Sequence, residues 1–111
     1  MPANNIIQIV ASESTPEKEA EFNKWYTEIH VPMLFEYKGV KRASRYRRLD
    51  DNEKNAKFLA IYEFKSIKDM EAFPDSPEYA DAIEDFENNK EVLGFKMKWA
   101  SSYELIKSYE R

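Results

Sequence analysis

The sequence contains no cysteine, a single histidine and only two glycines among its 111 residues. Without cysteine there is no disulfide framework, thiolate zinc site or cysteine nucleophile. One histidine excludes a multi-histidine metal centre within one chain, and two isolated glycines cannot form a glycine-rich phosphate loop. We therefore predict no metal and no cofactor. The histidine is of the type that ligates haem, but no other residue supports haem binding.

Long apolar runs and a strong excess of basic charge are also missing. No stretch approaches the roughly 20 apolar residues of a membrane span, and the first residues lack the pattern of a secretory signal. The 17 basic and 21 acidic residues give a net charge of −4, whereas a nucleic-acid-binding domain is more often strongly basic. We expect a cytoplasmic protein with neither a nucleic-acid nor a membrane partner, folded as one domain over residues 1–111.

Alternating strand and helix patterns run along the whole chain. Runs of β-branched and alternating residues predict strands, and Ser or Thr followed by Pro predicts helix starts. Pro32 should end or kink the first helix, because it lacks an amide donor. The expected elements are a strand at 6–11, a helix from 16 to about 32 with a short further turn at 33–37, strands at 40–49 and 57–64, short helices begun by Ser66 and Ser76, and a long strand at 95–105.

This order is the ferredoxin-like βαββαβ pattern of the α+β class. It implies an antiparallel four-stranded sheet with the helices on one face. The strand at 57–64 carries bulky apolar residues on both faces, with Phe58, Tyr62 and Phe64 against Leu59 and Ile61. Because the helices cover only one face, we expect a second copy of the chain to cover the other, giving a homodimer through the open sheet face.

The segment from Glu21 to Pro32, with Trp25-Tyr26 followed by His30-Val31-Pro32, precedes Gly39-Val40 and the pair Arg45-Tyr46. This arrangement resembles the EthD-like branch of the dimeric α+β barrel proteins. The resemblance in element order covers nearly the whole chain, and the specific motif covers about a quarter of it. The wider superfamily includes cofactor-free monooxygenases, muconolactone isomerases, haem-degrading enzymes and plain ligand-binding dimers, so the resemblance alone does not fix a function.

His30 is the candidate catalytic residue, because an imidazole exchanges protons near neutral pH. Tyr26 lies one helical turn earlier and could form a proton-handling pair with it. The resemblance places the superfamily's pocket in this region. The alternative is structural: at the expected end of the first helix, His30 would cap the last carbonyls and pack beside Pro32.

Arg45 and Tyr46 belong to a basic strand and should point to opposite faces of the sheet. Either could bind a carbonyl, carboxylate or phenolate of a ligand. The alternative for the basic strand is electrostatic, since residues 66–91 carry nine acidic and two basic residues that could face it.

Trp25, Tyr62 and Trp99 complete the candidate substrate-binding set with Tyr26, Arg45 and Tyr46. They could line a pocket for a flat apolar molecule, or simply form core and dimer interface. The leading hypothesis is a cofactor-independent monooxygenase or isomerase that uses His30 as general acid–base on a small aromatic or enolisable molecule. The alternative is a non-catalytic ligand-binding or structural dimer.

Overall fold

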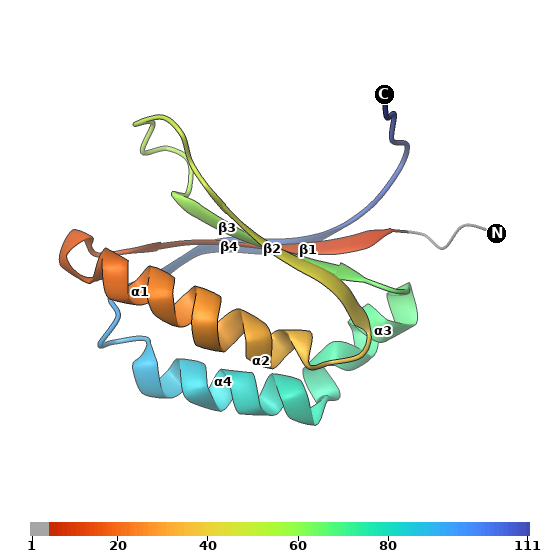
Figure 1. Cartoon of the computed structure of the whole chain (residues 1–111), viewed down its shortest axis with the longest axis horizontal. Helices are drawn as coiled ribbons and strands as arrows, with labels where there is room; N and C mark the ends of the chain where they lie inside the picture. The colour runs from red at the N-terminus through yellow and green to blue at the C-terminus, as the bar shows by residue number, and fades with distance from the viewer. Residues whose placement is uncertain (1–4) are drawn as a thin grey trace.

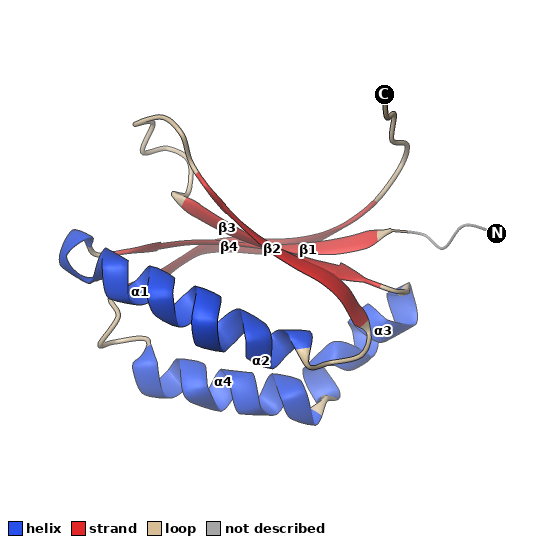
Figure 2. Ribbon diagram, viewed as in Figure 1, coloured by secondary structure: helices blue, strands red, loops and turns tan. Residues whose placement is uncertain are grey.

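The computed structural model describes residues 5–111 and contains one antiparallel sheet covered on a single face by helices (Figures 1 and 2). The strands are β1 (Ile6–Ser14), β2 (Val40–Arg47), β3 (Phe58–Phe64) and β4 (Phe95–Glu104). Their order across the sheet is β2-β3-β1-β4, with β1 between β3 and β4. This is the predicted ferredoxin-like α+β fold, and the prediction of its class is confirmed.

The strand register sorts the side chains into two sets. In β3 the residues Phe58, Ala60, Tyr62 and Phe64 are buried, and those between them are half-buried. The buried set faces the helices, where it joins the aromatic core around Phe22, which is fully buried. The alternation that predicted two apolar faces is therefore confirmed, because successive side chains in a strand point in opposite directions.

The first helix does not end at Pro32, so of the two expectations for this proline, an end or a kink, the end is wrong. The short turn η1 (Pro16–Lys18) leads into α1 (Glu19–Trp25), the π-helical turn η2 (Tyr26–His30) and α2 (Val31–Phe35), which follow one another without interruption. The amide of Val31 donates to the carbonyl of Tyr26, five residues back. This wider turn accommodates Pro32, which has no amide hydrogen to donate in the next position. His30 consequently lies within a continuous helix rather than at its end.

The second helical segment begins as expected. Ser66 caps α3 (Ile67–Ala72) by accepting a hydrogen bond from the amide of Asp69, and Ser76 caps α4 (Pro77–Asn89) in the same way through Tyr79. The turn η3 (Phe73–Asp75) connects the two helices. Among residues 5–111, none of the helices is long and apolar enough to cross a bilayer.

The opposite face of the sheet carries no helix (Figure 1). Two segments extend on this side of the sheet (Figure 2). One is the connection between β2 and β3, and the other is the end of the chain after β4, residues 105–111. Strand β2 stops at Arg47, two residues before the predicted end, and Leu49 is fully exposed. The predicted long last strand is confirmed by the ten residues of β4.

Candidate functional site

His30 lies on the wall of a cavity between the helices and the sheet. The cavity measures about 170 Å³. Its lining residues come from every strand except β2 and from the helical turns above them: Gln8, Val10, Tyr26, His30, Leu34, Tyr62, Phe73, Tyr79, Ile83, Phe86, Phe95, Met97 and Ala100. Met97 lies on the edge strand β4 and is 53% exposed. The cavity therefore faces solvent between β4 and α4. The cavity is therefore mostly apolar, with a few polar groups in its wall.

The imidazole of His30 is held between aromatic rings. It stacks on Trp25 with ring centroids 4.7 Å apart and meets Tyr26 edge-on at 5.2 Å. The Trp25 indole donates a 2.8 Å hydrogen bond to Asp85 on α4, which fixes the ring beneath the imidazole. With only 8% of its surface exposed, His30 is buried, and its Nδ1 has no hydrogen-bond partner within residues 5–111.

Burial lowers the pKa of His30 from 6.5 to about 4, and the nearby carboxylate of Asp85 opposes this only in part. Loss of hydration penalises the charged imidazolium more than the neutral ring. At neutral pH the ring is therefore neutral and can accept a proton. His30 does not cap the end of a helix, because the helix continues past it to Phe35.

Tyr26 and Tyr62 bring two phenol groups close together beside the imidazole. Burial raises the pKa of the Tyr62 phenol well above its ordinary value. Burial also raises the pKa of Tyr26, while Tyr62 and the positive charge of Arg45 work in the opposite direction. The two hydroxyls are close enough to influence each other's pKa. The buried Tyr62 hydroxyl nevertheless makes no hydrogen bond of good geometry within the described residues.

Arg45 supports this group from β2. Its guanidinium lies 4.4 Å above the centre of the Tyr26 ring and donates hydrogen bonds to Asn23 and Thr27 of the first helix. No carboxylate within residues 5–111 forms an ion pair with it. A partly buried cation without a counterion gives this corner of the site a positive potential.

The sheet divides the predicted site residues into two groups. Trp25, Tyr26, His30, Arg45 and Tyr62 gather on the helix side. Tyr46 and Trp99 lie together on the open face, where they line a separate depression of about 330 Å³ with Leu59 and three basic residues, Arg47, Arg48 and Lys54. They therefore do not share a cavity with His30, and Arg45 and Tyr46 point to opposite faces, as alternation predicted.

Asp85 is the residue of the site that the sequence analysis missed. In the sequence it is one of several acidic residues of the predicted helix, but it is half-buried whereas its neighbours Asp81 and Glu84 are exposed. The sequence contains only an indirect sign of this role: a buried tryptophan such as Trp25 usually needs a partner for its indole N–H. The electrostatic alternative for the basic strand has no support in the described residues: none of their ion pairs joins residues 38–48 to residues 66–91.

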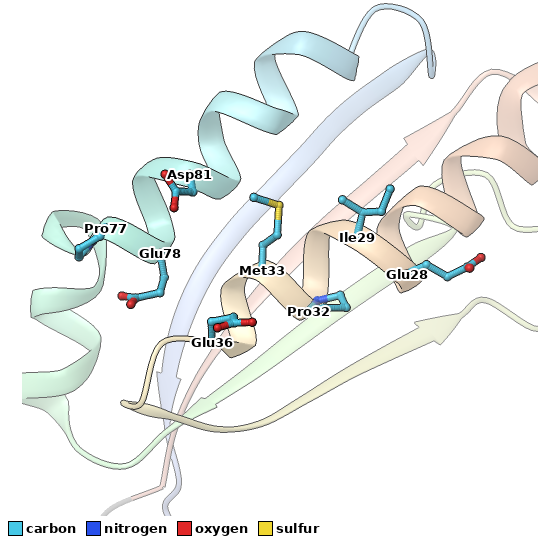
Figure 3. Close-up of a pocket in the computed structure, with 8 residues that line it drawn as sticks. All are labelled: Glu28, Ile29, Pro32, Met33, Glu36, Pro77, Glu78 and Asp81. Carbon is cyan, nitrogen blue, oxygen red and sulfur yellow. The ribbon is translucent and has the colours of Figure 1, made fainter.

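A larger but open groove lies outside the helical layer, between α2 and α4 (Figure 3). Met33 projects between the two helices there, and the acidic residues Glu28, Glu36, Glu78 and Asp81 also line the groove. None of the unpartnered buried polar atoms of residues 5–111 belongs to a residue that lines this groove, whereas two of them belong to residues that line the smaller His30 cavity, so that cavity is the better candidate site. Among residues 5–111, no cluster of three or more histidine, aspartate or glutamate residues could hold a metal ion.

The sheet order and the helices on one face define a ferredoxin-like α+β protein. A family model described as a domain of unknown function, DUF4286, matches residues 5–98. The chain therefore belongs to that family. A search of curated proteins found no match.

Solved structures with the same fold have little sequence in common with the chain. An EthD family protein from Bacillus halodurans has a TM-score of 0.65 at 10% identity, covering 95% of this chain and 99% of its own. A dimeric ferredoxin-like protein of unknown function from Bacteroides fragilis has a TM-score of 0.62 at 9% identity, with coverages of 95% and 96%. A candidate antibiotic biosynthesis monooxygenase from Nitrosomonas europaea has a TM-score of 0.58 at 17% identity, with coverages of 95% and 90%. The resemblance to EthD-like proteins is confirmed at the level of the fold.

Proposed function

We propose that this protein binds a small apolar or aromatic organic molecule in the His30 cavity and acts on it without a cofactor, as an isomerase or a monooxygenase. The observation that carries the proposal is that the only histidine, with an unpartnered Nδ1, and Tyr62, with an unpartnered hydroxyl, line the same cavity. Buried polar groups are normally paired, so two unpaired ones at the wall of a cavity indicate a ligand. The monooxygenase-like fold neighbour supports this reading.

In this mechanism His30 starts as a neutral base. It accepts a proton from an acidic C–H or O–H group of the ligand, and the negative charge that remains on the ligand oxygen is stabilised by Tyr62. Tyr26 and the positive charge of Arg45 behind it favour the same anion. The imidazolium that forms is disfavoured by burial and favoured by Asp85, so His30 readily returns the proton.

Two reactions can follow from this anion. In an isomerisation, His30 returns the proton to a different carbon of the ligand. In an oxygenation, the anion reacts with dioxygen, so that a CH₂ group becomes C=O with one oxygen atom while the other oxygen leaves as water with the two hydrogens. Both reactions require the same proton abstraction, and both therefore depend on His30.

We propose further that two copies associate through their open sheet faces. This face presents the half-buried side chains of Ile7, Ile9, Leu59 and Ile61 together with the exposed Trp99. An uncovered apolar sheet face is unfavourable in water, and a second copy supplies a matching surface. Fold neighbours described as dimeric support this proposal. The cytoplasmic location stays a prediction from the sequence.

The catalytic proposal is tested by native mass spectrometry of the protein purified from its own host, followed by turnover of any retained molecule. We expect a bound aromatic or enolisable compound. His30→Gln should lower its turnover by about 10² or more with the fold intact by circular dichroism. Tyr109→Phe, on the exposed C-terminal segment, is the matched control. Retained binding with no turnover by the wild-type protein would favour the non-catalytic alternative.

The dimer is tested by sedimentation equilibrium at micromolar concentration. Ile61→Lys places a charge on the open face and should yield monomers. The same substitution at Ile67, which is exposed on α3 in the helical layer, should leave the dimer intact. A wild-type monomer would refute the proposed association.

A further inference from the structure

The size of the His30 cavity limits its ligand. An apolar cavity of about 150 Å³ holds one benzene molecule, and this cavity measures about 170 Å³. Its walls are mainly apolar and aromatic, with Phe73, Phe86 and Phe95 among them. A single six-membered ring with one small substituent fits within this volume, whereas a fused two-ring molecule would have to extend through the open side between β4 and α4.

The polar atoms of the wall specify the substituent. Tyr62 is only 2% exposed, and its hydroxyl lacks a partner, as does Nδ1 of His30. A tyrosine hydroxyl can donate, and a neutral imidazole has one nitrogen that accepts. A ligand hydroxyl both accepts and donates, so it can satisfy the two groups with one oxygen atom. A hydrocarbon or an ether leaves at least one of them unpaired, at a cost in affinity.

The charge beside the site favours an acidic hydroxyl. Arg45 has no carboxylate partner within residues 5–111, and its guanidinium stands over Tyr26, whose ring lines the cavity. This positive potential stabilises partial negative charge on a ligand oxygen. Phenols and enols carry more of that charge than aliphatic alcohols, and they are planar, as the aromatic walls require.

From these three observations we infer that the natural ligand is a single-ring phenol or enol whose hydroxyl oxygen lies between Tyr62 and His30. The inference rests on the proposed function, because it assumes that the His30 cavity is the ligand site. It adds a limit on ring number and a required functional group. It also assigns Tyr62 a role in specificity that is separate from proton transfer by His30.

The test is isothermal titration calorimetry of the full chain with four probes, namely phenol, anisole, toluene and 2-naphthol. We expect phenol to bind about tenfold more tightly than anisole or toluene, the effect of one good hydrogen bond, and 2-naphthol not to bind. Tyr62→Phe should abolish the preference for phenol over anisole while leaving the affinity for toluene unchanged. Tyr109→Phe should preserve all four affinities.

The possible results distinguish this inference from the proposed function. Equal affinities for phenol, anisole and toluene would refute the required hydroxyl but leave an accessible cavity. Binding of 2-naphthol in preference to phenol would refute the limit to one ring. Failure of all four probes to bind would overturn the His30 cavity as a ligand site, and with it the proposed function.

Nuclear magnetic resonance supplies a second readout at the site itself. The chain has one histidine, so the imidazole signals need no assignment. Phenol at saturation should shift the His30 signals in the wild-type protein, and Tyr62→Phe should reduce the shift. An identical shift with toluene would show ring packing without the hydrogen bond and would refute the proposed position of the hydroxyl.

Discussion

The depressed pKa of His30 makes a prediction about stability as well as about catalysis. Burial among aromatic rings lowers this pKa from 6.5 to about 4. In the unfolded chain the imidazole is hydrated and returns to its ordinary value. Replacing His30 with glutamine removes the titration and keeps a polar side chain at the cavity wall. The perturbation is therefore the loss of one proton-binding equilibrium.

The sign and size follow from linkage between folding and proton binding. Between pH 6.5 and about 4 the unfolded chain binds this proton more readily than the folded protein. The free energy of unfolding therefore falls as the pH falls through this window and rises as the pH rises. A shift of this size corresponds to about 3 kcal/mol, lost in full only below pH 4. This is a substantial part of the 5–15 kcal/mol typical of a small domain.

The assay is urea unfolding of the wild-type protein and His30→Gln at several pH values from 7 to 4. Carboxylates also titrate in this range, but they do so in both proteins and cancel in the difference. We expect the free energy of unfolding of the wild-type protein to decline relative to the variant by up to about 3 kcal/mol on acidification. The pKa itself is read from the single histidine by nuclear magnetic resonance.

Two results would refute the reasoning. A folded-state midpoint near 6.5 would mean that the imidazole is hydrated, which is incompatible with its stacking on Trp25 inside the cavity. A difference between wild type and variant that stays constant from pH 7 to 4 would mean that folding does not change proton binding at this residue.

Three further changes test the site and its support. Asp85→Asn keeps an acceptor for the Trp25 indole but removes the charge that raises the pKa of His30, so nuclear magnetic resonance should find this pKa below that of the wild type. Phe22→Ala removes a fully buried ring and should lower the free energy of unfolding in urea by about 3–5 kcal/mol. Gly94 has a φ of +62° and lies against the Thr15 side chain, so Gly94→Ala should lower the melting temperature. Shortening Thr15 in the same variant should restore only part of the loss, because the backbone strain persists.

Element order and helix starts could be predicted from the sequence because they depend on local rules, whereas strand ends were less accurate: β1 runs to Ser14 rather than to residue 11, and β2 stops at Arg47. Alternation along β3 placed Tyr62 and Leu59 on opposite faces of the sheet, as the burial pattern of the strand confirms. Ser66 with Asp69 three residues later, and Ser76 followed by Pro77, predicted the two helix starts, and both serines cap their helices. These features need only side-chain periodicity and short-range hydrogen bonding.

The error at Pro32 has a physical explanation. A proline inside a helix is expected to break it when every turn has α-helical spacing. The chain instead inserts the π-helical turn at Tyr26–His30, with the Val31 amide bonded five residues back. Tertiary packing of Tyr26, His30 and Leu34 against the core stabilises this turn. Local propensity could not reveal it, because the packing partners come from distant strands.

The candidate site could be predicted only in part, since its members come from different elements. Tyr26 and His30 are neighbours within one helix, and the sequence could pair them. Tyr62 and Arg45 join them only because the sheet register sets β2 and β3 beneath that helix. Asp85 arrives from α4 through its bond to Trp25, a contact between residues 60 apart in sequence.

The aromatic residues on the two faces of the sheet lie in different surroundings. On the helix side, the rings around His30 enclose a small volume and leave polar atoms unpaired, which suits a ligand. On the open face, Tyr46 and Trp99 adjoin basic side chains in a separate depression, which a second copy would cover in the proposed dimer. Substitutions at Tyr62 should therefore change ligand affinity without altering assembly, whereas charged substitutions at Trp99 should weaken assembly first. If Trp99→Asp yielded monomers with full ligand affinity, each subunit would contain a complete site, and the sheet alone would separate binding from association.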